Sequence, residues 1–225
     1  MKNNQKGFTL VEIAIVLVII GLLLGGILKG QEMIVQAKIK NAITNFSGVS
    51  AAYFGYQDRY RATPGDDIQA TRWTLPTVAI AGNGDRVLTG AYNIACPTPL
   101  VAGSPESCLW WDHLRRSGFL SGSGGVQPQN AFNGILGVQT GDAVSTPPAA
   151  VLPITTGFTN LIMCSSNLPD KVAIALDVQM DDGVPNAGAV RATLASGNPD
   201  ILTTTATPAT YLETGTGFYT LCRQF

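Results

Sequence analysis

A continuous apolar segment near the N-terminus constrains the fold of this chain more than any other feature. The segment runs for 21 residues from Phe8 to Leu28, and its only charged residue is Glu12. At about 1.5 Å per residue, a helix of this length covers the roughly 30 Å of hydrocarbon in a bilayer. A carboxylate there costs about 2.5–3.5 kcal/mol on insertion scales, which favours a specific partner for Glu12 over an ordinary anchor that tolerates it.

The residues on either side of this segment predict its orientation. A secretory signal peptide would end in a small-residue cleavage site after the apolar run, but here Lys29 follows and the helical pattern continues. The only small residue at a suitable boundary is Gly7, which precedes the run. Lys2 and Lys6 are expected to stay in the cytoplasm, so that the bulk of the chain faces outward.

The sequence Lys6-Gly-Phe-Thr-Leu-Val-Glu12 resembles the processing site of type IV prepilins and of the related pseudopilins of type II secretion. The resemblance covers the leader, the apolar segment and the helix after it. It implies that a prepilin peptidase cleaves between Gly7 and Phe8 and that the new amine of Phe8 is N-methylated. It also implies that Glu12 pairs with the Phe8 amine of a neighbouring subunit. Such a pair would form only on assembly. It would offset the free-energy cost of the lone carboxylate and would select the register between neighbouring subunits.

Beyond Gly30 the helical pattern becomes amphipathic. A stripe of mostly aromatic residues recurs at spacings of 4, 3, 4, 3 and 4, which places it on one helix face under a globular domain. Pro64 and Gly65 predict the end of the helix near Arg61. The members of the stripe are Ala42, Phe46, Val49, Tyr53, Tyr56 and Tyr60.

The remainder of the chain is rich in glycine, proline, threonine and serine, which predicts short strands and loops in one head domain. The segment 172–180 alternates like a strand, but Asn167, Pro169 and Asp170 before it favour a helix. The resemblance and this pattern together predict an α+β, pilin-like lollipop. Its expected parts are a cleaved leader at 1–7, a transmembrane or filament-core half-helix at 8–30, an amphipathic half-helix at 31–62 and a head at 63–225. Within the head we expect strands at 134–139, 158–164, 189–194 and 217–222, a helix at 109–117, and long loops at 97–105 and 147–153.

Four cysteines lie in the head and none has the spacing of a metal site. In an exported chain they are expected to form disulfides, although three connectivities are possible and free buried thiols are the alternative. We favour a local bridge between Cys96 and Cys108 and a second between Cys164 and Cys222 that holds the C-terminal strand.

Charge and motifs argue against nucleic-acid binding and against catalysis. Removal of Lys2 and Lys6 leaves 12 basic and 15 acidic residues without a basic cluster, so no specific nucleic acid is expected. The single histidine, His113, follows Asp112 directly, and neighbours on a helix point apart, so we expect a structural histidine. No hydrolase, metalloprotease or phosphate-binding motif occurs in the sequence. The chain is therefore not expected to be an enzyme.

An acidic loop predicts the one cofactor that we consider, calcium. Asp177, Asp181, Asp182 and Asn186 gather oxygen ligands beside glycines, and some pilins and pseudopilins bind calcium through such loops. The spacing is not that of an EF-hand, and a turn whose aspartates accept backbone N–H groups explains the same residues. The segments 64–67 and 82–85 are interpreted as tight turns on the same grounds.

The resemblance implies a structural subunit that first lies in the inner membrane with one span and its head outside the cytoplasm. The subunit then leaves the membrane and enters an extracellular filament. Its implied partners are prepilin peptidase, the inner-membrane assembly machinery, related pilin subunits and further copies of itself. Cell adhesion and secretion are the processes that such filaments serve. The alternatives are a type II secretion pseudopilin and, less favoured, a monomeric membrane-anchored protein that binds carbohydrate through Trp73, Trp110 and Trp111.

Overall fold

The computed structural model describes residues 9–141, 158, 160–199 and 210–225. The chain divides into two compact units, one ending at Lys40 and the other beginning at Asn41. The boundary lies inside the first helix, α1 (Leu10–Tyr60), which has 51 residues. The predicted boundaries of the leader, the two half-helices and the head remain predictions.

In the first unit, α1 carries the apolar segment, and α1 is long and apolar enough to cross a membrane by length and composition. Its start, Leu10, lies two residues after the predicted start at Phe8, which falls outside the described residues. Its end, Tyr60, agrees with the predicted stop, because Arg61 turns into the left-handed region with φ 55° just before Pro64.

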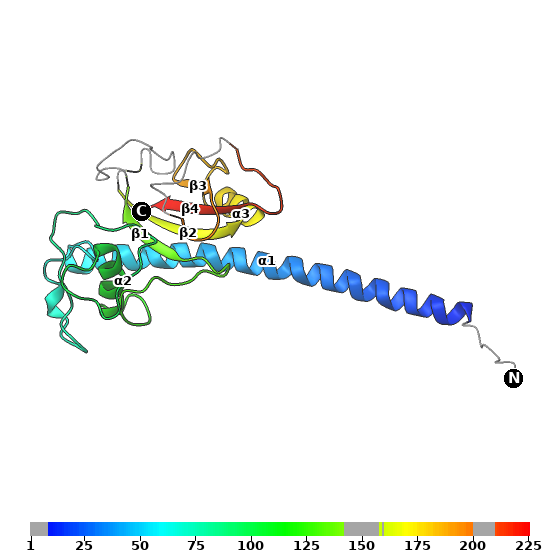
Figure 1. Ribbon diagram of the computed structural model, residues 1–225, viewed down its shortest axis with the longest axis horizontal. Helices are drawn as coiled ribbons and strands as arrows, with labels where there is room; N and C mark the ends of the chain where they lie inside the picture. The colour runs from blue at the N-terminus through cyan, green and yellow to red at the C-terminus, as the bar shows by residue number, and fades with distance from the viewer. Residues whose placement is uncertain (1–8, 142–157, 159, 200–209) are drawn as a thin grey trace. The chain divides into compact units, whose positions relative to one another are not determined.

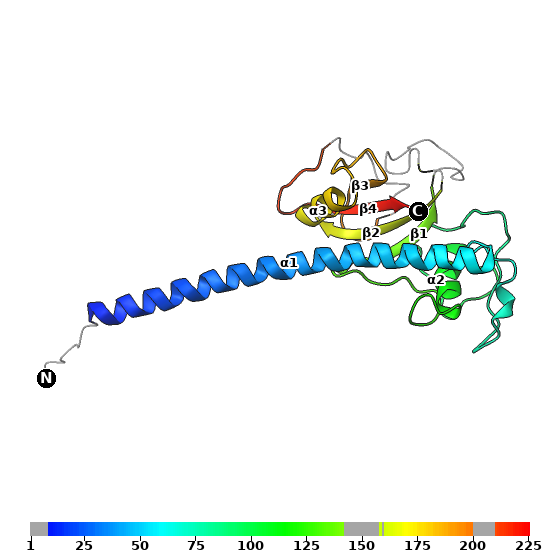
Figure 2. The same cartoon turned by 180° about the vertical axis from the view of Figure 1, so that it is seen from behind.

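In the second unit, the aromatic stripe of α1 forms the base of the core, as predicted. Phe46 and Tyr56 are fully buried, and Tyr53 packs against Trp110 and Phe225 with ring centroids 6.3 and 4.7 Å apart. Burial of each large side chain contributes about 1.5–3 kcal/mol. The C-terminal part of α1 lies beside strands β1 and β2 in both views (Figures 1 and 2).

The second unit contains a four-stranded antiparallel sheet in the order β1-β2-β4-β3. The four predicted strands are present with shifted ends. The largest shift is in β2, where the pairing with β4 is irregular between Ser165 and Leu168 and the strand runs on to Pro169. The strands are β1 (Leu136–Thr140), β2 (Leu161–Pro169), β3 (Val190–Leu194) and β4 (Phe218–Gln224).

Among the described residues after α1, this unit also contains two α-helices and one short 3-10 helix. The segment predicted as helix rather than strand is α3 (Asp170–Met180). Pro169 precedes its first turn, whereas Asn167, which was expected to belong to the cap, has φ 56° and bonds to Phe132 and Gly197 instead. The helix α2 (Glu106–Arg116) begins three residues before the predicted Leu109, and η1 spans Ala70–Arg72.

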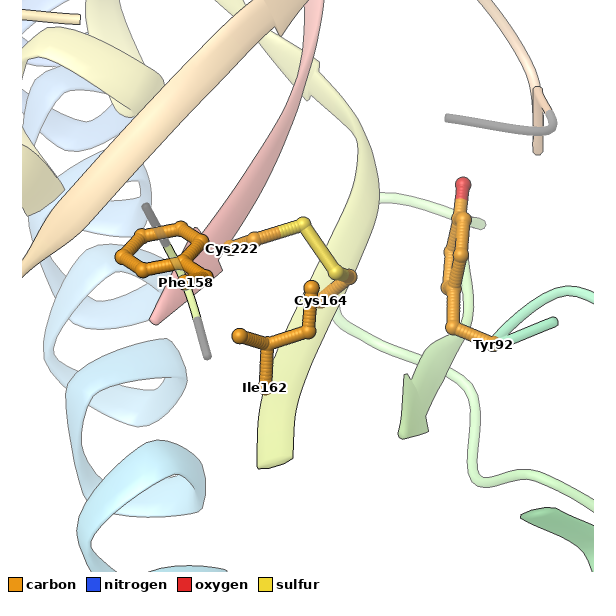
Figure 3. Packing of buried hydrophobic residues seen from close by; sticks show 5 residues of the cluster. All are labelled: Tyr92, Phe158, Ile162, Cys164 and Cys222. Atoms are coloured by element: carbon orange, nitrogen blue, oxygen red, sulfur yellow. A yellow bond between two sulfur atoms is a disulfide. The ribbon is translucent and has the colours of Figure 1, made fainter. Parts of the chain in front are cut away.

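Both predicted disulfides are present, Cys96–Cys108 and Cys164–Cys222, and no described cysteine is free. Cys164 on β2 lies directly opposite Cys222 on β4. Figure 3 shows this bridge within a buried cluster that includes Tyr92 and Ile162. The second bridge therefore ties the C-terminal strand into the core, as expected from the sequence.

His113 is buried on α2 and joins two loops. Its Nδ1 accepts a hydrogen bond from the N–H of Gly65 at 2.9 Å, and its Nε2 lies 2.8 Å from the carbonyl oxygen of Ile80. Both bonds are satisfied at once by the neutral tautomer with its proton on Nε2. Asp112 pairs with Arg116 at 2.6 Å, so the two neighbours form no catalytic dyad and the structural interpretation is confirmed.

Acidification should destabilise the head through His113. Burial lowers the pKa of this imidazole, the charge of Arg116 acts in the same direction, and the bond to Ile80 and the charges of Asp112 and Asp67 oppose the shift. The unfolded chain therefore binds this proton more tightly, and stability is lost as the pH falls below the ordinary histidine pKa of about 6.5. We expect the urea midpoint of the full chain in detergent micelles, followed by tryptophan fluorescence, to fall between pH 7.5 and 5.5.

The matched control is His113→Gln, whose amide has one acceptor and one donor for the same two partners but does not titrate. This variant should lose less stability over that pH range than the wild type. Equal losses in both proteins would show that His113 is not the titrating group.

Candidate functional site

The candidate assembly site lies at the start of α1, around Glu12. The carboxylate oxygen Oε2 of Glu12 accepts hydrogen bonds from the backbone N–H and the side-chain hydroxyl of Thr9, both at 2.8 Å. In return, the N–H of Glu12 donates to Oγ1 of Thr9 at 3.3 Å. This reciprocal arrangement is a capping box, and sequence analysis missed Thr9 although the Thr-x-x-Glu spacing signals it.

The predicted processing residues, Gly7 and Phe8, lie outside the described residues. The pairing of Glu12 with the Phe8 amine of a neighbour therefore remains a prediction. The structure does place Glu12 in the first turn of α1, two residues after its start at Leu10.

The helix surface around Glu12 is apolar and uncovered. The most apolar 18-residue window of α1 has a mean hydropathy of 2.8, and none of it is buried. Leu10 is 91% exposed, and Leu17, Leu22 and Leu28 are each more than 60% exposed. Such a surface requires a lipid or protein environment, because an isolated helix of this composition would expose it to water.

The predicted calcium ligands are partly brought together at the end of α3. One carboxylate oxygen from each of Asp177, Asp181 and Asp182 lies within 4.8 Å of the others, whereas Asn186 is an exposed residue of the following loop. Burial raises the pKa of the Asp177 carboxyl, and the charges of Asp182 and Asp181 add to the effect. Hydrogen bonds from Tyr211 and from the N–H of Gly183 oppose it.

The alternative interpretation, a turn capped by aspartates, also has direct support. Asp181 accepts a hydrogen bond from the N–H of Val190 at 2.9 Å, and Asp182 accepts one from the N–H of Val184 at 2.8 Å. Each of these carboxylates therefore has a role in the loop without an ion. Calcium binding by this loop remains a prediction.

A second acidic group supports the interpretation of 64–67 and 82–85 as turns. Asp66 accepts hydrogen bonds from the N–H groups of Gly84 and Arg86, and Glu106 accepts from Asn83 and Thr89. These two buried carboxylates hold the segment 83–89 in place. Sequence analysis missed Glu106, because only the fold brings it to this segment.

Two of the three tryptophans proposed for carbohydrate stacking are not available for it. Trp110 and Trp111 are fully buried, with ring centroids 4.8 Å apart, and Trp73 packs on Tyr56 and Tyr60. A sugar stacks on an exposed aromatic face, so this part of the carbohydrate-binding alternative is wrong for Trp110 and Trp111.

The calcium prediction is tested by thermal unfolding of the full chain in micelles. Calcium at a hundred times its Kd should add about 2.7 kcal/mol of stability, and magnesium should add less because it tolerates irregular ligand sets poorly. Asp181→Asn should remove most of the calcium effect, whereas Asp58→Asn, at an exposed carboxylate on α1, should retain it. Equal effects of calcium and magnesium on all three proteins would leave the aspartate-capped turn as the explanation.

Comparison with known proteins gives one match, at the N-terminus. Residues 2–28 match the family model described as the prokaryotic N-terminal methylation motif. The matched segment includes Gly7, Phe8 and Glu12 and ends within the apolar half of α1. No curated protein and no solved structure matches the chain significantly. The methylation motif supports the resemblance to type IV pilins and pseudopilins for the N-terminal segment, residues 2–28.

Proposed function

We propose that this chain is a structural subunit of a type IV pilus-like filament, assembled from the inner membrane through packing of its N-terminal helix. The observation that carries the proposal is the uncovered apolar surface of α1 in the segment that matches the methylation motif. Farther along the same helix, residues 42–56 instead bury their apolar stripe in the head. One helix thus has one part with an internal partner and one part that needs an external partner.

The proposed function follows from the two environments that can cover the apolar part of α1, the membrane and the filament. Before assembly it lies in the membrane as a single span, with the head outside the cytoplasm. Prepilin peptidase removes the leader, and the inner-membrane assembly machinery transfers the subunit into the filament. There the apolar helices of many copies and of related subunits cover one another, and the pair between Glu12 and the Phe8 amine selects the register.

A type II secretion pseudopilin is the alternative within the same family. The relatively large head favours a pilin or a minor pilin over a compact major pseudopilin. Glu12 argues against a subunit confined to the extreme tip, because a tip subunit has no neighbour above it to pair with. The membrane-anchored carbohydrate-binding protein is less favoured, since two of its three proposed tryptophans are buried.

The proposal is tested by mass spectrometry of the N-terminal peptide from sheared surface filaments and from membranes. An N-methylated Phe8 peptide in the sheared fraction would establish a surface filament subunit. The same peptide in membranes alone would favour a pseudopilin or a scarce minor pilin. An intact leader that begins at Met1 would overturn the filament proposal.

Replacement of the Glu12 carboxylate should separate membrane insertion from assembly. Glu12→Ala should preserve insertion and reduce incorporation into filaments by about a hundredfold or more, because the Phe8 amine of the neighbour would be buried without a partner. Both quantities are measured by immunoblotting of membrane and sheared fractions. The control is Glu32→Ala, which removes an exposed carboxylate that pairs with Lys29 beyond the apolar segment. Normal incorporation of Glu12→Ala would contradict the pairing mechanism.

A further inference from the structure

We propose that the head binds a phosphate group, carried by a small apolar molecule, in a cavity beside Arg115. The cavity has a volume of about 560 Å³ and lies between α2 and three loop segments of the head. Its lining comes from the segments 75–80, 98–100 and 122–124 and from Asp112, Arg115 and Arg116. No described residue of the lining belongs to α1, so the site is independent of the proposed function.

Two neighbouring arginines at the end of α2 differ in their partners. The guanidinium of Arg116 pairs with Asp112 at 2.6 Å and also donates to two backbone carbonyl oxygens. The guanidinium of Arg115 donates hydrogen bonds through Nη1 alone, to the carbonyl oxygens of Gly124 and Val126 at 2.6 and 2.8 Å. Among the residues that the structure describes, no carboxylate forms an ion pair with Arg115. Its positive charge therefore lacks a direct counter-ion.

The unused edge of the Arg115 guanidinium is one that suits a phosphate group. Nε and Nη2 carry parallel N–H bonds that can donate to two oxygens of the same phosphate. Nε is buried without a partner beneath the following loop, where a β-carbon at Gly122 would lie 3.4 Å from it. Burial lowers the pKa of this guanidinium, and the charge of Asp112 opposes the shift. A half-buried cation without a counter-ion is unfavourable, so an anion at this edge is stabilised.

The loop over Arg115 offers further donors. It spans residues 121–125 and reads Ser-Gly-Ser-Gly-Gly. Its backbone N–H groups and its two serine hydroxyls have no hydrogen-bond partner within the described part of the chain. Gly122 and Gly124 have φ values of 100° and 70°, which side chains rarely allow. A glycine loop that is not held by its own N–H groups can move away from Nε and donate to the remaining phosphate oxygens.

The rest of the cavity is close to neutral and largely apolar. Among the described residues of the lining, Asp112 is the one acid, and Arg116 neutralises it. Leu75, Val78 and Leu100 contribute to the apolar wall. A cavity with apolar walls and a few polar groups is typical of a site for small molecules. The wall therefore favours a phosphate group on an apolar body over a free phosphate ion.

Three soluble probes separate the parts of this chemistry: phenyl phosphate, inorganic phosphate and phenol. Each is titrated into the full-length chain in micelles of an uncharged detergent, and the Nε–H resonance of Arg115 is followed by NMR. We expect a saturable shift with phenyl phosphate, which should bind about tenfold more tightly than inorganic phosphate because its ring covers apolar wall. Phenol should give no shift, and added sodium chloride should weaken the binding of phenyl phosphate.

The absence of a saturable shift with phenyl phosphate would overturn the inference. An equal shift with phenol would overturn the role of the charge. Equal affinities for the two phosphates would overturn the role of the apolar wall.

Substitutions on the loop test the site without removing Arg115, whose Nη1 also holds two carbonyl oxygens. Ser123→Asp places a carboxylate in the cavity and should weaken phenyl phosphate binding by about tenfold or more, through repulsion and competition for the guanidinium. The matched control is Ser123→Asn, a neutral side chain of the same size, which should retain most of the affinity. Arg59→Met, at an exposed arginine of α1 outside the cavity, should bind like the wild type.

Unchanged binding by Ser123→Asp would contradict the placement of the phosphate beside Arg115. Equal weakening in Ser123→Asp and Arg59→Met would show that phenyl phosphate responds to the overall charge of the head, and it would also overturn the inference.

Discussion

Burial of apolar surface along α1 is the interaction on which the rest of the structure depends. From Ala42 to Tyr56 the helix supplies a stripe that the head covers, with Phe46 and Tyr56 fully buried. From Leu10 to Leu28 the helix is more apolar still, and none of its most apolar window is covered. The hydrophobic effect therefore stabilises the head from within and drives the apolar segment towards lipid or towards other subunits.

The head is held by covalent and polar links in addition to its apolar core. The Cys164–Cys222 bridge joins the two central strands, and the Cys96–Cys108 bridge fastens the loop before α2. Much of the segment between α1 and α2 is irregular, so its backbone N–H groups need partners from side chains. Asp66, Glu106 and His113 supply several of them while buried. These links thus hold together a head that is rich in glycine and proline.

The carboxylate of Glu12, which is unfavourable in an apolar environment, has one contact within the chain and a second, proposed contact in the filament. In this structure its carboxylate accepts two bonds from Thr9, and in the proposed filament it pairs with the amine of a neighbour. Neither contact requires the head. This separation explains how the assembly end of such a subunit can be recognised by a short motif, while no curated protein matches the chain as a whole.

The sequence by itself determined the features that depend on neighbouring residues. These include the apolar span, the methylation motif, the aromatic stripe of α1, the end of α1 before Pro64 and the helix at 170–180. Each follows from periodicity, capping or the restricted backbone of proline, which act over a few residues.

Tertiary structure alone decided the features that join distant segments. It buried Trp110 and Trp111, and it carried Glu106 to the N–H groups of Asn83 and Thr89. It also lengthened β2 through an irregularity in its pairing with β4. These outcomes depend on which surfaces pack together, because the free energy of a contact between residues far apart in the sequence is set by the whole fold and not by local pattern.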